Sequence, residues 1–139
     1  MNNDDLQTLL SERNREIDEL YARIEQLKGE MDQVLDTERE VRRADGAFTE
    51  YISQEKELAN NMSTNERVRS AVGFGDRMNR VIKGANYRLA VSGFEDIKKA
   101  LKKSRDDIER SIEQCRRRIS VLQDSVRTLN QQLSPADWR

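Results

Sequence analysis

The sequence predicts an all-α protein: a single domain, residues 1–139, built as a long antiparallel hairpin of two helices with a short helical connector. Two observations predict this fold. Apolar residues recur every three or four positions over most of the chain, and its one Pro lies near the end. The composition, 37% charged and 35% hydrophobic, leaves fewer apolar residues than a globular domain usually has. Burial is therefore expected to follow a narrow, coiled-coil-like seam.

The first helix is expected over residues 6–62. Alternating steps of three and four residues from Leu10 to Met62 give sixteen positions, of which twelve are apolar and four are polar, namely Arg13, Glu38, Asp45 and Glu55. The flanking positions are mostly charged or amide side chains. A seam sustained for about seven heptads is much longer than the stripe of an ordinary globular helix.

Residues 63–75 are expected to form the connector. Ser63 and Glu66 have the spacing of a capping box, and a short apolar run follows them. Gly73 and Gly75, followed by Asp76, predict that one helix stops and the next begins at this point.

The second helix is expected over residues 76–134, because its apolar positions continue from Met78 to Leu133. The pair Ser134 and Pro135 is predicted to end it, since the residue before a proline avoids helical backbone. Residues 135–139 then form a tail. A short connector lets two helices of similar length fold back antiparallel.

A register in which paired residue numbers add to roughly 138 is one hypothesis for this hairpin. It places Arg13 opposite Asp124 and sets Asp45 level with Gly93. Because Gly46 adjoins Asp45, glycines of both helices would coincide there, and a bend or loosening is expected.

Charge is divided unequally along the chain. Residues 1–62 carry 16 acidic and 8 basic side chains, a net charge of −8, whereas residues 63–139 carry 10 and 17, a net charge of +7. Opposite charge favours the mutual approach of the two halves or of complementary partners. A basic surface for nucleic acid would not normally have an acidic half beside it, so no nucleic-acid partner is expected.

Catalytic and metal chemistry find little support in the residues. The chain has no His, and Gly73, Phe74 and Gly75 lack the Gly-Lys-Ser/Thr ending of a phosphate-binding loop. The sequence therefore predicts a protein that is not an enzyme and has no cofactor or metal. Cys115 lies in the second seam; a small buried hydrophobe is the first interpretation, and an intersubunit disulfide or a reactive thiol stays open.

No apolar run approaches the length of a membrane span, and the first residues are acidic where a signal peptide would be basic and then apolar. A cytoplasmic location is expected, with export without a cleavable signal left open.

The segment Ile112–Leu122, together with the order of long helix, connector, Gly-containing turn and second long helix, resembles the helical helper proteins encoded beside LXG toxins of type VII secretion systems. The likeness is to the YwqH-like family, relatives of the WXG-type small secreted hairpins. Val81 to Gly84 stand where that family places Trp-x-Gly; Ile82 occupies the Trp position, so Gly84 alone carries over. The family's export signal, Tyr-x-x-x-Asp/Glu after the second helix, has no counterpart after Leu133.

The resemblance implies a non-enzymatic targeting chaperone that docks on the helical N-terminal domain of a toxin, together with a second small helical protein. The expected contacts are of three kinds. Residues beside the seam are Leu9, Tyr21, Leu35, Val81 and Val121. Aromatic residues at the turn and the terminus are Phe74 and Trp138, and Ile82 and Gly84 stand at the family's Trp-x-Gly position. Two alternatives stay open: a self-associating structural coiled coil that forms a homodimeric four-helix bundle, and a chaperone of another secreted or phage protein.

Overall fold

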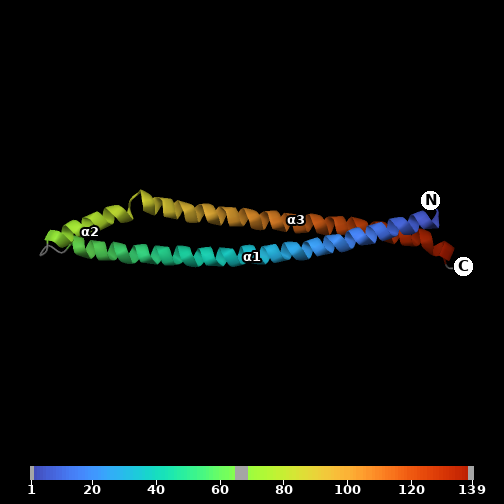
Figure 1. Cartoon of the computed structure of the whole chain (residues 1–139), viewed down its shortest axis with the longest axis horizontal. Helices are drawn as coiled ribbons and strands as arrows, with labels where there is room; N and C mark the ends of the chain where they lie inside the picture. The colour runs from blue at the N-terminus through green and yellow to red at the C-terminus, as the bar shows by residue number, and fades with distance from the viewer. Residues whose placement is uncertain (1, 65–68, 138–139) are drawn as a thin grey trace. The chain divides into compact units, whose positions relative to one another are not determined.

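A computed structural model describes residues 2–64 and 69–137, and within these ranges it leaves out the side chains of residues 69 and 134–137. The described residues form three helices and no strand: α1 (Asn3–Ser63), α2 (Arg69–Ile82) and α3 (Ala85–Asp137) (Figure 1). The prediction of an all-α protein is confirmed.

Helix α1 has side-chain caps at both ends. Its start is capped by Asn2, whose side-chain oxygen accepts a hydrogen bond from the amide of Asp5 at 2.8 Å. Asp4 and Asp5 lie in the first turn, where negative charge interacts favourably with the helix dipole. At the other end the hydroxyl of Thr64 donates to the carbonyl of Asn60 at 3.0 Å and satisfies one of the last acceptors.

The predicted helix stop at Gly73 and Gly75 is wrong, because α2 runs through both glycines to Ile82. No described glycine has a positive φ, so neither adopts the left-handed conformation of a helix C-cap. Gly75 is instead buried against α1. The interruption falls at Lys83 and Gly84, where the amide of Gly84 bonds to the carbonyl of Val81 at 3.1 Å, three residues back.

The predicted end of the second helix at Ser134 and Pro135 is also wrong, because α3 continues to Asp137. The residue before a proline only prefers to avoid helical backbone, and a proline near a helix end removes a single backbone hydrogen bond. The helix therefore tolerates Pro135 in its last turn.

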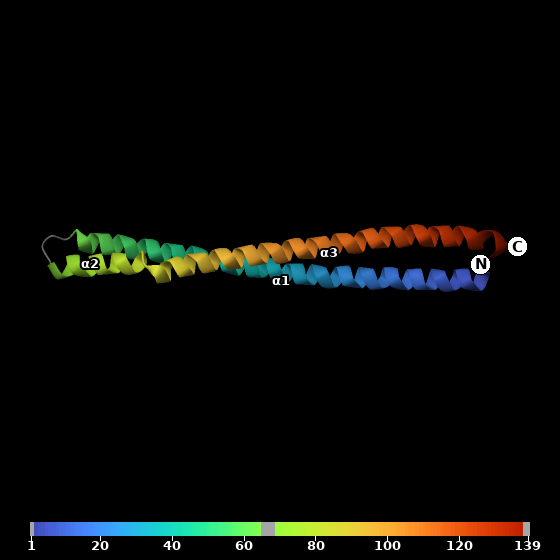
Figure 2. The ribbon, with the colours of Figure 1, turned by 90° about the horizontal axis from the view of Figure 1, so that it is seen from above.

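The chain divides into two compact units, which are described separately. Unit 1 comprises Met1–Gln33 and Ser104–Arg139, and unit 2 comprises Val34–Lys103. In unit 1 the start of α1 lies beside the end of α3 (Figure 2). Leu6 clusters with Leu129 and Leu133, whereas Ile24, further along α1, clusters with Ile119, earlier in α3. The two segments of unit 1 are therefore antiparallel.

Most of the well-buried apolar residues lie in unit 1. Leu122 is 1% exposed at the centre of a cluster with Ile17, Ile24 and Ile119. Cys115 is half-buried and packs against this cluster as a small apolar group, and its thiol is free. Beside the cluster, the guanidinium of Arg118 donates to Glu16 at 3.1 Å. Asp124 pairs with Arg127 one turn along the same helix, and the expected position of Arg13 opposite Asp124 stays a prediction.

Unit 2 is held by contacts of a different kind. Phe48 of α1 lies between two aromatic rings of α3, with centroids 6.0 Å from Tyr87 and 5.7 Å from Phe94. Asp45 forms an ion pair with Lys98. The expected loosening at Gly46 and Gly93 produces no interruption, because α1 and α3 run continuously through these positions.

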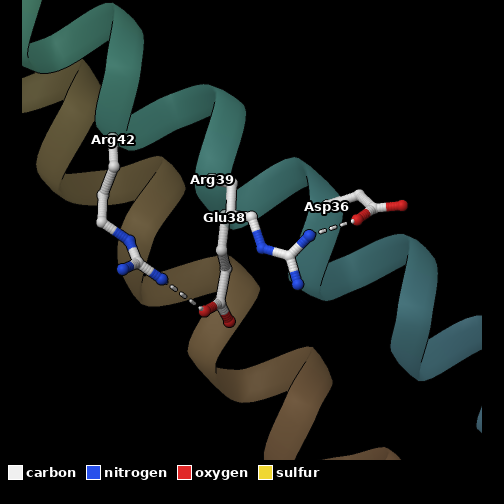
Figure 3. A network of polar contacts seen from close by, with 4 residues as sticks. All are labelled: Asp36, Glu38, Arg39 and Arg42. Carbon is white, nitrogen blue, oxygen red and sulfur yellow. Dashed lines mark hydrogen bonds and ion pairs between the residues drawn. The ribbon is translucent and has the colours of Figure 1, made fainter.

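Along α1, unit 2 also carries a network of polar contacts (Figure 3). Arg42 reaches back one turn to the carboxylate of Glu38 at 3.8 Å, and Arg39 donates to Asp36 at 3.0 Å. The Glu38 side chain is only 13% exposed although it occupies a seam position. A charged residue therefore stands where the heptad pattern would place an apolar one.

Candidate interaction surface

Burial differs sharply between the two units. Among the described residues, the buried apolar side chains of unit 2 are Ala59 and Ile82 alone, and unit 1 holds the other eight: Leu6, Ile17, Ile24, Leu27, Ile119, Leu122, Leu129 and Leu133. Exposed large apolar side chains show the reverse distribution. Unit 1 has Tyr21 and Val121, whereas unit 2 has Tyr51, Leu58, Phe74, Val81, Leu89, Val91 and Ile97.

Unit 2 contains a groove of about 300 Å³ with contributions from all three helices. Its walls are mainly apolar and aromatic, and Val81, one of its lining residues, is 72% exposed. Glu55 and Asn86 are its polar lining residues. The complete lining is Phe48, Tyr51, Ile52, Glu55, Met78, Val81, Ile82, Asn86, Tyr87 and Ala90.

The groove belongs to a larger surface that we call the uncharged face. Residues spaced i, i+4, i+7 and i+11 share one side of a helix. Each helix has such a stripe through the groove-lining positions, and none of the stripe positions is charged: Ala47, Tyr51, Gln54 and Leu58 in α1, Phe74, Met78 and Val81 in α2, and Asn86, Ala90, Gly93 and Ile97 in α3. In a chain that is 37% charged, about four charges would be expected among eleven positions.

Small residues leave room on the α3 side of this face. A side-chain carbon added at Gly93 would meet no atom within 4 Å, and Ala90 lines the groove. Tyr51 stands out on the α1 side and is 58% exposed. A continuous surface that joins exposed aromatic and aliphatic groups is typical of a protein interaction site.

Close packing of α1 and α2 supports one end of the uncharged face. Ala59 is fully buried beneath Gly75, whose missing side chain allows the two backbones to approach. The side-chain amide of Asn79 donates to the side-chain oxygen of Asn60 at 3.2 Å. These contacts hold the α2 stripe beside the α1 stripe.

The predicted contact residues occupy different environments. Phe74 and Val81 are exposed on the uncharged face, and Ile82 lies at the bottom of the groove, 7% exposed. Gly84 lies at the helix interruption. Leu35 is half-buried in unit 2.

In unit 1, Leu9 packs against the cluster of Leu6, Leu129 and Leu133. Tyr21 and Val121 are exposed, and the Tyr21 hydroxyl accepts a hydrogen bond from Gln123 at 3.3 Å. Trp138 lies outside the described residues. Of the predicted contacts, Val81 and Ile82 line the groove and Phe74 belongs to the uncharged face, whereas Leu35 does not line the groove.

Sequence reasoning missed the α1 and α3 parts of this face. Tyr51, Leu58, Ala90 and Ile97 belong to it but were not proposed as contacts. The signal that could have found them is the run of uncharged residues with helical spacing on one side of the seam.

Metal-binding clusters and membrane spans are both absent from the described part of the chain. Residues 2–64 and 69–137 contain no group of three or more Cys, Asp or Glu side chains placed to hold a metal ion. Over the same residues, no helix combines the length and the apolar character that crossing a membrane requires.

Comparison of the chain with protein-family models, with curated proteins and with solved structures gave no match.

Proposed function

We propose that this protein acts without catalysis, by binding a helix of a partner protein on the uncharged face of unit 2. The observation that carries the proposal is the mainly apolar groove, in which Glu55 is the one charged lining residue, together with the three uncharged helical stripes that pass through it in an otherwise highly charged chain. Burying the exposed parts of Tyr51, Leu58, Phe74 and Val81 would supply the free energy of binding, at roughly 25 cal/mol per Å² of apolar surface before the costs of association.

A helix is the partner element that suits this surface. The stripes have the period of an α-helix and run along the helix axes, so a helix of the partner protein can place its own i, i+3, i+4 and i+7 side chains between them. Ala90 and Gly93 allow its backbone to approach closely. An extended strand would find no sheet edge among the described helices to pair with.

The resemblance to the LXG-associated helpers supplies the identity of the partner in this proposal. The proposed partner is the helical N-terminal domain of a type VII-secreted toxin, bound in the cytoplasm before export. A self-associating structural coiled coil and a chaperone of another secreted or phage protein are the alternatives. The single long hairpin expected for the whole chain stays a prediction, and the proposal depends only on unit 2.

The test uses the N-terminal domain of an LXG protein encoded beside this gene, with binding to the full chain measured by isothermal titration calorimetry. Val81→Glu is expected to weaken binding by at least about 100-fold, because it puts a charge into the apolar contact. The matched control is Val121→Glu, an exposed valine of unit 1, 57% accessible. Circular dichroism verifies that both variants stay helical.

Equal affinity of wild type and Val81→Glu would contradict the proposed surface. Failure of the wild type to bind, or the absence of any LXG protein near the gene, would contradict the toxin as the partner and favour the alternatives.

A further inference from the structure

We infer that, in the absence of another partner, a second copy of this chain covers the uncharged face, paired about a two-fold axis parallel to the helices of unit 2. The inference concerns the regulation of the site in the proposed function, because a bound second copy has to leave before a partner helix can dock. The dimer itself can be measured without any partner.

Charge along the two edges of the uncharged face selects this axis. The α1 edge is acidic, since Glu50 and Glu57 are exposed and each directly precedes a stripe residue. The α2 edge is basic, since Arg77 and Arg80 are exposed and each likewise directly precedes a stripe residue. Along α1 and α2, one edge of the face therefore carries negative charge and the other positive charge, whereas Asp96 is the charged residue that precedes a stripe residue of α3.

The packing of α1 on α2 shows that these four charged residues lie on outer edges. Ala59 follows a stripe residue of α1, Gly75 follows a stripe residue of α2, and these two positions are buried against each other. In a helix, the residue before and the residue after a given position point to opposite sides of it. Because the residues that follow the stripes face the contact between the helices, the residues that precede them face away from it.

Two copies of a flat helix pair can stack face to face in two symmetric ways. A two-fold axis parallel to the helices sets α1 of one copy over α2 and α3 of the other, so that each acidic edge meets a basic edge. An axis perpendicular to the helices sets α1 over α1 and brings Glu50 and Glu57 near the acidic edge of the other copy. Like charges side by side are unfavourable, so the parallel axis is selected.

The parallel axis also fixes which residues meet, because rotation about it leaves the height of every residue unchanged. Height here means position along the helix axes. Because α1 and α2 are antiparallel, two residues of unit 2 lie at the same height when their numbers add to the same total as those of Asn60 and Asn79, which are hydrogen bonded to each other. Leu58 and Val81 have that sum, so Leu58 of one copy comes to the height of Val81 of the other. Both side chains are exposed on the uncharged face, and their contact would bury both.

Two more pairs agree with this arrangement without further adjustment. Tyr51 of one copy falls within about 3 Å in height of Ala90 of the other, which sets a large side chain over a small one. Glu57 of one copy likewise falls within about 3 Å in height of Arg80 of the other, which sets an acidic side chain beside a basic one. The surface is thus complementary to itself in shape and in charge.

One residue opposes the dimer. Glu55 lines the groove, and the parallel axis places the two Glu55 carboxylates at the same height inside the four-helix arrangement. Two carboxylates sharing a confined site repel one another. This repulsion keeps the dimer weak enough for a partner helix to displace the second copy.

The test is sedimentation equilibrium of the full chain without any partner. Wild type is expected to dimerise reversibly, and Glu57→Arg or Arg80→Glu alone to raise the dimer dissociation constant about 10-fold, since each replaces two attractive pairs by two repulsive ones. An equimolar mixture of these two variants is expected to regain the wild-type constant, because the heterodimer contains two attractive pairs, one as in the wild type and one with its signs reversed. Arg88→Glu makes the same change from a basic to an acidic residue at an exposed position outside the uncharged face, and it is expected to change the dimer dissociation constant little.

Glu55→Gln is expected to tighten the dimer, because it removes the repulsion between the two carboxylates. A wild-type chain that stays monomeric up to its solubility limit would overturn the inference. This axis would be overturned if Glu57→Arg left the dimer dissociation constant unchanged, or if the mixture of the two variants did not regain the wild-type constant. Toxin binding is measured separately from dimerisation, so the two proposals can fail independently.

Discussion

Gly75→Ala is the substitution for which the structure gives the sharpest expectation. A side-chain carbon at this position would lie 2.5 Å from the carbonyl oxygen of Ala59, 2.6 Å from the hydroxyl of Ser63 and 2.7 Å from its backbone nitrogen. Two of these three atoms belong to the α1 backbone and cannot rotate away. Helices α1 and α2 would have to separate by roughly 1 Å to reach ordinary contact distance.

The expected change in the free energy of unfolding follows from two opposing terms. Alanine is favoured over glycine inside a helix by about 1 kcal/mol. Forcing an extra carbon into a packed contact costs about 1–3 kcal/mol, and the rigid backbone neighbours place Gly75 toward the upper end. The net effect is a loss of about 1–2 kcal/mol of stability.

Gly46→Ala is the matched control, since Gly46 also lies inside a helix of unit 2 but has no atom within 4 Å of the added carbon. Here only the propensity term acts, and a gain of about 0.5–1 kcal/mol is expected. Urea unfolding followed by circular dichroism at one protein concentration measures both variants. If Gly75→Ala stabilises the protein as Gly46→Ala does, the close approach of α1 and α2 at Gly75 is refuted.

Three further expectations concern packing and charge. Leu122→Ala should cost about 2–5 kcal/mol in the free energy of unfolding, because Leu122 is 1% exposed in the unit 1 core; a loss below about 1 kcal/mol in urea unfolding would contradict that burial. Arg118→Ala should cost at most about 1 kcal/mol in the same assay, because its pair with Glu16 is partly exposed; a larger loss would contradict a surface pair. The hydrogen bond to Asp45 raises the pKa of Lys98 above 10.5, so this pair stabilises the fold below that pH and the stabilisation is lost as pH rises through the raised pKa. The difference in Tm between wild type and Asp45→Asn should therefore shrink at alkaline pH, and a constant difference would contradict the coupling.

Helical periodicity was sufficient to predict the class of fold and the extent of α1. Steps of three and four residues place the apolar positions of residues 10–62 on one side of a helix, and the structure has α1 at Asn3–Ser63. The helix ends in the second half depended on glycine and proline, and those expectations were wrong. Glycine has two uses in a helical protein, a turn and a close contact, and the local sequence around Gly75 does not distinguish them.

The candidate surface could be predicted only in part, for a similar reason. Val81 stands out as an apolar residue beside the seam, but Leu9 does so equally, and the structure exposes Val81 and packs Leu9 against a core cluster. Ile82, a seam residue that was also an expected contact, is buried. Whether an apolar residue beside the seam is covered depends on which helix lies opposite it, which periodicity along one helix does not contain.

The uncharged face and the sparse core of unit 2 have one cause in the sequence. Three of the four polar seam positions, Glu38, Asp45 and Glu55, lie in unit 2, where they occupy sites that apolar residues would fill in a two-helix core. The apolar residues displaced from the seam line the uncharged face beside it, so unit 2 buries little in a single chain. Covering this face by a second copy or a partner helix would complete the core, and any ligand that binds only the folded form stabilises it. For unit 2, binding and folding are therefore coupled through the same side chains.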